Sequence, residues 1–355
     1  MKKKITSNDV AKLAGVSQAT VSMILNNKTG PSFSEDTKNK VLDAAIQLGY
    51  KTPSLTGTAT GEKLIAVFIP TLSNPYYTQL TASIEKYALM QGYKIILCNT
   101  SRNKDYENYY LDYFSHSKTA GIIFTFVPSY PKLVEQLSQS IPIVLIGEKK
   151  DEITIPSIEL SNIKAGILMG EYLLSLGHSH IAFLSTPIQN LSSARQQRIN
   201  GIKQAMAEHN VSDNLDIIIS DHIVETDQNS IPYEYSVGYE LAIEYTKRTN
   251  AKATAFIGVN DMTALGIISA LSKSGYKIPE DFSVVGFDNI FVSSVSIPSI
   301  TTIEHHLNLR SQSAVDLIIS RHAESTLSNH ISPQINKIEY DPQLVIRNST
   351  GPANH

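Results

Sequence analysis

Polar side chains suited to binding a hydroxylated small molecule recur directly after apolar runs of the 355-residue chain. Amide and carboxylate groups can hold sugar hydroxyls through paired hydrogen bonds, and a tyrosine ring can cover the face of a sugar. The candidates are Ser73, Asn74, Tyr76 and Tyr77 after residues 64–70, Asn260 and Asp261 after 253–259, Asp288 and Asn289 after 282–288, and Arg198 in a predicted helix. Helix capping is a competing interpretation for Asn74 and the preferred one for Asp261, and a structural ion pair competes for Arg198 and Asp288.

Catalytic and metal-binding patterns are weak by comparison. The sequence contains no HExxH, cysteine cluster, P-loop or G-x-S-x-G motif. His178 and His180 lie where a predicted helix meets a strand, and the adjacent His305 and His306 would face opposite sides of a strand. We therefore predict no catalytic residues, no metal site and no cofactor, with an enzyme on the same α/β core as an alternative.

The stretch GVSQATVSMILNN, residues 15–27, carries no lysine or arginine although it lies in the most basic part of the chain. Gly15 can supply a tight turn, and Ser17 can cap a helix over 17–25. With Ala11 allowing close packing and Val21 facing inward, the pair of helices has the helix-turn-helix layout. The second helix of that layout can read base edges in a major groove. The alternative is a three-helix bundle that makes protein contacts.

Charge is distributed unevenly between the two parts of the chain. Residues 1–60 hold eight lysines and four acidic residues, which gives this part of the chain a net charge of +4. Because the whole chain has a net charge of −3, the remaining residues carry a net charge of −7. A basic module on an acidic body favours an anionic partner for the module, although a solvated lysine-rich terminus has the same composition. Lysines can hold phosphates while short polar side chains meet the bases.

Two regions with different periodicity surround a linker. Apolar positions predict helices over 6–13, 17–25 and 34–48, and the Thr/Gly/Pro-rich segment 51–63 predicts a linker. Beyond it, apolar runs predict strands near 64–70, 94–100, 121–127, 141–147, 180–186, 215–220, 253–259 and 282–288. Helical stretches alternate with them near 76–91, 105–117, 161–176, 193–209, 235–248, 261–274 and 307–320. This alternation predicts parallel sheets, as a barrel or as two doubly wound halves, and an internal echo favours two halves.

The compartment can be inferred from composition. A single cysteine, Cys98, cannot form an internal disulfide, which favours a reducing environment. No apolar run approaches the roughly 18 residues needed to span a bilayer, and no signal-peptide core follows the N-terminal lysines. We expect a cytoplasmic, nucleoid-associated protein without a membrane partner.

Several stretches together resemble the lactose/galactose repressor (LacI/GalR) family. They are DVAKLAGVSQATVSMILNN, FSEDTKNKVLDAAIQLGY, SNPYYTQLTASIEKYALMQGYKIILCNT, ARQQRINGI, GVNDMTALGIISAL, IPEDFSVVGFDN and PSITTIEHH. The resemblance covers about residues 5–320 in the family's order. It implies an α/β fold class, with a helix-turn-helix head on a two-lobed, periplasmic-binding-protein-like core of doubly wound parallel sheets.

The resemblance also implies domain boundaries and partners. We expect a DNA-binding head at 1–50, a hinge or linker at 51–63 and a core at 64–350. The first lobe would comprise about 64–158 and 290–322, and the second about 159–289 and 323–350. The partners would be palindromic operator DNA, a small effector (a sugar, sugar phosphate or nucleobase) and a second copy of the chain or more. The function would be effector-controlled repression of a carbohydrate-use operon, with a sugar-sensing protein without operator control as an alternative.

Site residues carry over from the family motifs position by position. The implied effector-binding residues are Ser73, Asn74, Tyr76, Tyr77, Ser161, Arg198, Asn260 and Asp288. The implied DNA-binding residues are Thr6, Ser17, Gln18, Ala19, Thr20, Ser22, Met23, Asn26, Lys28 and Leu55. Met23 replaces the usual polar base-reading residue and Ser161 the usual aspartate. Leu55 is the candidate minor-groove wedge in a linker that lacks the usual arginine.

Overall fold

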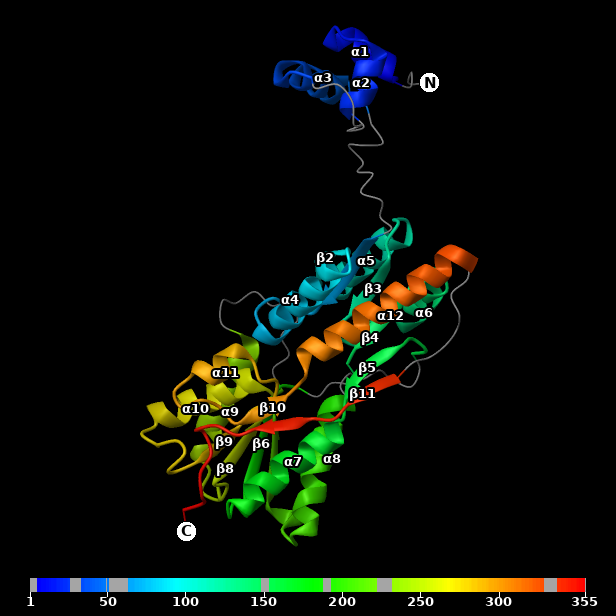
Figure 1. The fold of residues 1–355 in the computed structure, drawn as a ribbon. Helices are drawn as coiled ribbons and strands as arrows, with labels where there is room; N and C mark the ends of the chain where they lie inside the picture. Colours follow the sequence, from blue (N-terminus) through cyan, green and yellow to red (C-terminus); the bar gives the residue numbers. More distant parts are fainter. Residues whose placement is uncertain are drawn as a thin grey trace. The chain divides into compact units, whose positions relative to one another are not determined.

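The chain forms two compact units, Met1–Glu62 and Lys63–His355. The computed structural model describes residues 5–25, 33–48, 50, 63–147, 153–187, 193–221, 232–328 and 337–354. Figure 1 shows the helices and strands of each unit. Within the described parts of the chain, no helix is both long and apolar enough to cross a membrane.

Three helices build the first unit: α1 (Ser7–Ala14), α2 (Gln18–Leu25) and α3 (Glu35–Leu48). Asp9 closes the start of α1 because its Oδ2 accepts hydrogen bonds from the backbone N (2.8 Å) and the hydroxyl (2.7 Å) of Thr6. Gly15 ends α1 with a φ of +67°, a left-handed conformation that favours glycine. Val10, Ala11, Val21, Leu25, Val41, Ala44 and Ala45 form the core. The three predicted helices are confirmed to within one residue at each end.

The first lobe of the second unit is a six-stranded parallel sheet with the order β11-β5-β4-β3-β1-β2. Its strands are β1 (Leu64–Ile69), β2 (Lys94–Asn99), β3 (Gly121–Phe124), β4 (Ile143–Ile146), β5 (Ser157–Leu160) and β11 (Lys337–Tyr340). One face packs against α4 (Pro75–Met90) and α12 (Leu307–Ser328), and the other against α5 (Lys104–Ser115) and α6 (Pro131–Ser138). Helices on both faces make this sheet doubly wound.

The second lobe repeats the plan with a four-stranded parallel sheet of order β7-β6-β8-β9. Its strands are β6 (Ile181–Ser185), β7 (Leu215–Ile219), β8 (Ala255–Gly258) and β9 (Ser283–Val285). One face carries α7 (Asn162–Ser175) and α8 (Ser193–Glu208), and the other α9 (Tyr233–Thr246) and α10 (Asp261–Lys273). The short elements are η2 (Ser212–Asn214), α11 (Phe291–Val295) and the antiparallel pair β10 (Thr302–Glu304) and β12 (Gln343–Val345).

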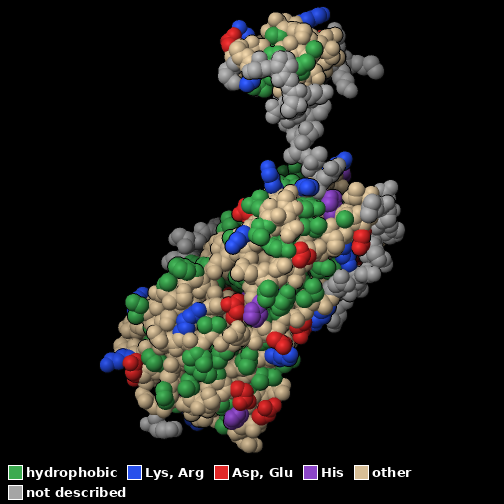
Figure 2. All heavy atoms as spheres, in the orientation of Figure 1, with side chains coloured by type: hydrophobic (Ala, Val, Ile, Leu, Met, Phe, Trp, Pro, Cys, Tyr) green, Lys and Arg blue, Asp and Glu red, His purple; other side chains and the backbone are tan. Residues whose placement is uncertain are grey.

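Three chain crossings join the lobes, after β5, after β10 and after β11. Two contacts show that the three connecting segments lie beside one another. The backbone N of Ser161 donates to Tyr340 O (3.0 Å), and His306 Nε2 lies 3.0 Å from Asp341 O. Figure 2 shows one face of the chain, where apolar side chains lie among charged ones over both lobes.

The structure differs from the predicted lobe boundaries in two segments. Residues 290–304 were placed in the first lobe, but Ile300 packs in the core of the second lobe and β10 pairs with β12. Residues 323–350 were placed in the second lobe, but α12 continues to Ser328 against the first sheet and β11 pairs in parallel with β5. The first crossing follows Leu160, the last residue of β5.

Candidate functional site

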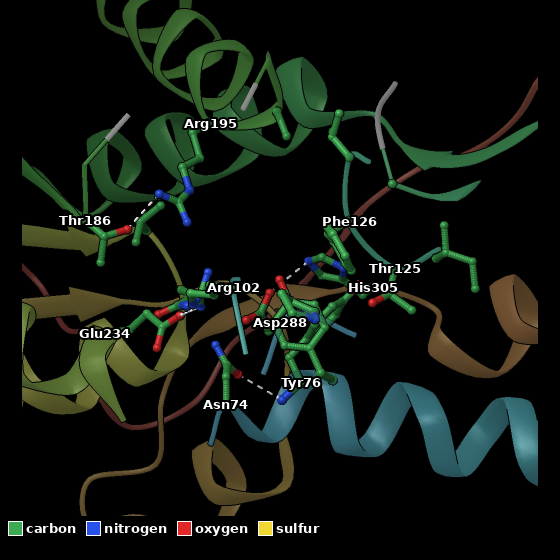
Figure 3. A pocket seen from close by; sticks show the side chains of 18 of the residues that line it. Asn74, Tyr76, Arg102, Thr125, Phe126, Thr186, Arg195, Glu234, Asp288 and His305 are labelled. Carbon is green, nitrogen blue, oxygen red and sulfur yellow. Dashed lines mark hydrogen bonds and ion pairs between the residues drawn. The ribbon is translucent and has the colours of Figure 1, made fainter. Parts of the chain in front are cut away.

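A cavity of about 430 Å³ lies between the two lobes of the second unit. The carboxyl ends of strands from both sheets surround it, which is where open α/β sheets bind ligands. Its volume lies within the range of small-molecule sites. Figure 3 shows side chains from both lobes directed into this space.

The first-lobe wall is set by the start of α4. Asn74 caps the helix, because its Oδ1 accepts a hydrogen bond from Tyr76 N (3.0 Å), and it also lines the cavity. This places the Tyr76 and Tyr77 rings edge to face, with their centroids 5.1 Å apart. Burial raises the pKa of Tyr77 to about 12, so its hydroxyl is a neutral hydrogen-bonding group at neutral pH.

Arg198 is fixed in place on the second-lobe wall. Its Nε donates to Asn162 Oδ1 (2.7 Å), its Nη1 donates to Val259 O (2.8 Å), and its Cζ lies 3.3 Å from the centroid of the Phe287 ring. The backbones of α7 and α8 can approach closely because Gly201 has no side chain: a Cβ there would lie 2.1 Å from the carbonyl oxygen of Ile163. The glycine thus brings Arg198 within reach of Asn162.

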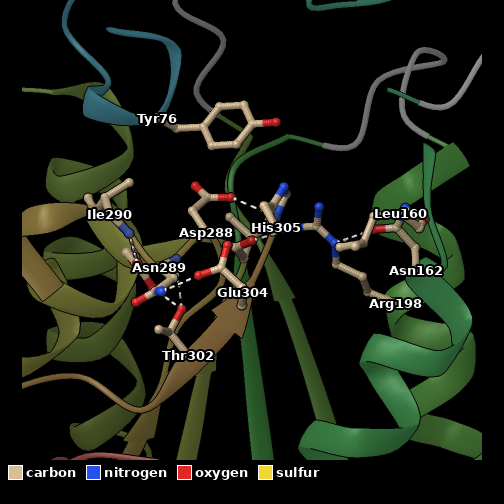
Figure 4. Close-up of polar contacts among 12 residues, drawn as sticks. Tyr76, Leu160, Asn162, Arg198, Asp288, Asn289, Ile290, Thr302, Glu304 and His305 are labelled. Carbon is tan, nitrogen blue, oxygen red and sulfur yellow. Dashed lines mark hydrogen bonds and ion pairs between the residues drawn. The ribbon is translucent and has the colours of Figure 1, made fainter. Parts of the chain in front are cut away.

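Asp288 and His305 meet at the floor of the cavity, where Nε2 of the histidine lies 3.2 Å from Oδ1 of the aspartate. The contact is not aligned as a hydrogen bond, and Nε2 has no other hydrogen-bond partner in the described structure. Figure 4 shows the pair close to Tyr76 and Arg198. Asp288 has a φ of +131°, a strained conformation for a non-glycine residue. The neighbouring residue stabilises this backbone conformation, because Asn289 Nδ2 donates a hydrogen bond to Glu304 Oε2 (2.5 Å).

The contact with Arg310 determines which ring nitrogen of His305 carries the proton. Its Nη1 lies 3.1 Å from His305 Nδ1, and a guanidinium can only donate, so Nδ1 accepts and Nε2 carries the ring proton. Burial first, and then the positive charge of Arg310, lowers the pKa of His305 well below its usual value, so the ring is neutral. Burial raises the pKa of Asp288 well above that of an exposed carboxyl group.

A second group of charged residues lines the cavity: Arg102, Glu234 and Arg195. Arg102 Nη2 of the first lobe and Glu234 Oε1 of the second form an ion pair at 2.8 Å that spans the cleft. Arg195 Nη1 donates to Thr186 Oγ1 (2.7 Å) and to Pro187 O (3.1 Å). Burial lowers the pKa of Arg195 from its usual value. We refer to these three residues as the Arg102–Glu234–Arg195 cluster.

Six of the eight predicted effector-binding residues line the cavity: Asn74, Tyr76, Tyr77, Arg198, Asn260 and Asp288. Ser73 and Ser161 are not among the lining residues. The Ser73 hydroxyl lies 2.9 Å from Thr71 Oγ1, and Asn162 lines the cavity in place of its neighbour Ser161. That the six residues bind an effector remains a prediction.

Asp261 is a structural residue. Its carboxylate is fully buried and accepts hydrogen bonds from Ser293 Oγ, Ile290 N (3.0 Å) and Thr302 Oγ1 (2.6 Å). The cap of α10 is Asn260, whose Oδ1 accepts from Thr263 N (2.9 Å). The preferred interpretation of Asp261 as the helix cap is therefore wrong, because its side chain joins α10 to neighbouring segments instead.

The Arg102–Glu234–Arg195 cluster was not predicted, although two of its residues follow recognisable sequence patterns. Arg102 follows β2 at the same sheet edge as Asn74, and Arg195 precedes Arg198 by three residues, which places both on one face of α8. His305, which was treated only as a strand residue, lines the cavity, whereas His306 contacts Asp341. In the described structure, no group of three or more His, Cys, Asp or Glu side chains could hold a metal ion.

The second helix of the first unit presents a neutral surface. Ser17, Gln18 and Ala19 are exposed, and Thr20, Ser22 and Met23 are partly exposed, while Val21 and Leu25 face the core. Ser17 caps α2, since its Oγ accepts from Thr20 N (3.0 Å). Gln18 Nε2 donates to Ser7 Oγ (3.1 Å) of α1. Three predicted DNA-binding residues, Asn26, Lys28 and Leu55, lie outside the described residues.

A three-helix head of this kind and a two-lobed α/β body with a polar cleft define a class of helix-turn-helix regulator. Residues 6–53 match the family profile "Bacterial regulatory proteins, lacI family", and residues 62–339 match "Periplasmic binding proteins and sugar binding domain of LacI family". The chain belongs to the LacI family of bacterial regulatory proteins.

Curated relatives match over nearly the whole chain. The HTH-type transcriptional regulator DegA of Bacillus subtilis (strain 168) is 33% identical over 359 residues, covering 99% of each chain. The HTH-type transcriptional repressor PurR of Mannheimia succiniciproducens is 30% identical, covering 97% of this chain and 98% of its own. Catabolite control protein A of Priestia megaterium is 30% identical, covering 95% and 98%.

Solved structures share the fold. The lac repressor dimer bound to operator and the anti-inducer ONPF has a TM-score of 0.68 at 25% identity and covers 98% of this chain and 100% of its own. A LacI family regulator of Enterococcus faecium with bound ribose has a TM-score of 0.67 at 24% identity and covers 82% and 100%.

Proposed function

We propose that the protein is a transcriptional repressor that binds operator DNA as a dimer and is controlled by a small effector in the inter-lobe cleft. The observation that carries this proposal is the cleft itself, where polar side chains of both lobes line one cavity. The family membership and the lac repressor structure, whose dimer is bound to operator, support the same assignment. A carbohydrate-use operon is the proposed target because of the sugar-binding family profile.

Control requires the effector to favour one lobe arrangement. A ligand held by Tyr76 of the first lobe and by Arg198 and Asp288 of the second would contact both only at one cleft opening. It then shifts the population of lobe arrangements by its difference in affinity between them. A tenfold change in DNA affinity needs only about 1.4 kcal/mol of this coupling.

DNA recognition is assigned to the exposed face of α2. Gln18 and Thr20 would read base edges, Ser17, Ala19 and Ser22 would lie beside them, and Met23 would contact a thymine methyl group. Thr6, Asn26, Lys28 and Leu55 complete the proposed DNA-contacting set. A regulator that binds the chromosome works in the cytoplasm, and we assign no catalytic activity to the chain.

The proposal is tested by a gel-shift titration of the full chain against the promoter DNA of its own gene, at stated salt concentrations. Gln18→Ala and Thr20→Ala are expected to weaken specific binding roughly tenfold or more, and to change non-specific binding little. Gln47→Ala, an exposed glutamine on α3, is the matched control. Lack of sequence-selective binding below about 100 mM salt would refute the proposal, because phosphate contacts are strongest there.

A further inference from the structure

The Arg102–Glu234–Arg195 cluster lies at the cleft but plays no part in the function proposed above. Arg102 comes from the loop after β2, Arg195 from the first turn of α8 and Glu234 from the first turn of α9. Figure 3 shows these side chains directed into the cavity. The positive charge of Arg102 contributes to lowering the pKa of Arg195, after burial, so the two guanidinium groups act on one another. Two cationic side chains that line one cavity favour an anion beside them.

The described lining of the cavity has more positive than negative side chains. The cations are Arg102, Lys104, Arg195, Arg198 and Arg310, and the carboxylates are Glu107, Glu234 and Asp288. Burial raises the pKa of both Glu107 and Asp288, which weakens the negative contribution further. The described lining therefore carries a net positive charge of at least two before any ligand binds. A cleft lined mainly by side chains of one sign attracts ligands of the opposite charge.

The buried carboxylate of Glu234 provides an independent argument for a ligand that carries a hydroxyl group. Its side chain is only 4% exposed, and although Oε1 pairs with Arg102, Oε2 is buried without a hydrogen-bond partner in the described structure. A buried carboxylate oxygen without a hydrogen-bond partner favours binding of a donor, because leaving it unpaired costs free energy. The hydroxyl group of a ligand is such a donor.

We propose that the effector is a hydroxylated acid, a sugar carrying a carboxylate or phosphate group, with its anionic group between Arg102 and Arg195 and a hydroxyl donating to Glu234 Oε2. This inference rests on the proposed function, since it names the ligand class of the same cleft. Asp288 at the floor and Arg198 on the second-lobe wall line the same cavity. The described lining has five cationic and three acidic side chains, so it suits an anionic ligand better than a neutral sugar or a nucleobase.

Thermal-shift and calorimetric titrations of the full chain test the inference with matched ligands. The pairs are glucose against glucuronate, galactose against galacturonate, and ribose against its phosphate ester, with hypoxanthine as the nucleobase. An acid or a phosphate ester is expected to raise Tm and its neutral counterpart to leave Tm unchanged at equal concentration. The carboxylate and phosphate members of the panel distinguish the two kinds of anion.

Substitutions of the two arginines test whether the cluster causes the preference for an anionic ligand. Arg102→Gln and Arg195→Gln are expected to lower affinity for the active acid at least tenfold and to reduce its salt dependence. Arg248→Gln, at an exposed i,i+4 pair on the end of α9, is the matched control. Should Arg195→Gln fail to fold, Arg195→Lys keeps the charge and is expected to keep the preference for the acid.

Three results would overturn the inference: equal shifts by neutral sugars or hypoxanthine, unchanged affinity in both glutamine variants, or no shift by any acid or phosphate ester. The ligand-free gel shift separates this failure from failure of the proposed function. If operator binding persists while the acids do not bind, only the ligand class is wrong. If operator binding is absent, the proposed function itself fails.

Discussion

The ion pair between Arg102 and Glu234 should contribute a measurable interaction free energy between the two lobes across the cleft. The two groups are 2.8 Å apart and belong to different lobes, and their side chains are 29% and 4% exposed. We predict that replacing Arg102 with methionine destabilises the protein, because it removes the charge that compensates the buried Glu234 carboxylate. Methionine keeps much of the length of the arginine stem, which limits the loss of packing.

The size of the effect follows from the distance and the exposure. At an effective dielectric constant of about 20, two charges 2.8 Å apart attract by about 6 kcal/mol before desolvation. Desolvation cancels much of this, and breaking a fully buried pair usually costs about 3–5 kcal/mol. Because Arg102 is nearly one-third exposed, we discount that value and expect about 2–3 kcal/mol for Arg102→Met.

A double-mutant cycle separates the pair from its surroundings. Urea unfolding of the wild-type chain, Arg102→Met, Glu234→Gln and the double variant gives the coupling energy, which we expect to be about 1–3 kcal/mol. Lys164→Met, which removes the exposed ion pair to Asp341, serves as the control and should cost less than Arg102→Met does. A coupling below about 0.5 kcal/mol between Arg102 and Glu234 would refute the reasoning, since the pair would then behave like a surface contact.

Three further predictions concern the framework of the second unit. Gly201→Ala should destabilise the chain by about 1–2 kcal/mol and weaken effector binding in calorimetry, because the new Cβ would lie 2.1 Å from Ile163 O; unchanged binding would contradict this. Asp261→Ala should cost about 2–5 kcal/mol in urea unfolding, because three donors lose their acceptor; a loss below about 1 kcal/mol would contradict it. Burial lowers the pKa of His178, so its neutral form is favoured in the folded chain. Its contribution is complete above the unfolded pKa of about 6.5 and is lost as pH falls toward the folded pKa. His178→Gln should therefore flatten the pH dependence of Tm below about pH 6.5, and an unchanged profile would contradict this.

Most of the fold was predictable because long elements carry strong periodicity. The eight apolar runs all contain strands of the two sheets, and the helices of the head follow their caps and apolar faces closely. The elements that were missed are short or polar, such as β5 with the sequence SIEL and β11 with KIEY. Strand β11 joins β5 in the sheet from 177 residues further along the chain, and no local pattern encodes that pairing. The predicted placement of residues 323–350 in the second lobe differs from the structure for this reason.

The candidate site was predictable only where local sequence sets geometry. Asn74, Asn260 and Asp288 follow strands directly, and strand ends must converge on the sheet edge. Glu234 comes to the cleft because of the way α9 packs against the second sheet, and Arg102 meets it only because the lobes face one another. A contact between separate lobes depends on their relative placement, which the spacing of residues along the chain does not specify.

The three crossings also restrict how the cleft can move. A single covalent connection would leave two rigid bodies free to rotate about every axis, whereas three connections side by side leave bending as the soft motion and resist twist and sliding. The hydrogen bond from Ser161 to Tyr340 and the contact between His306 and Asp341 hold the connections together. An effector that contacts both lobes would therefore act mainly on this bending motion.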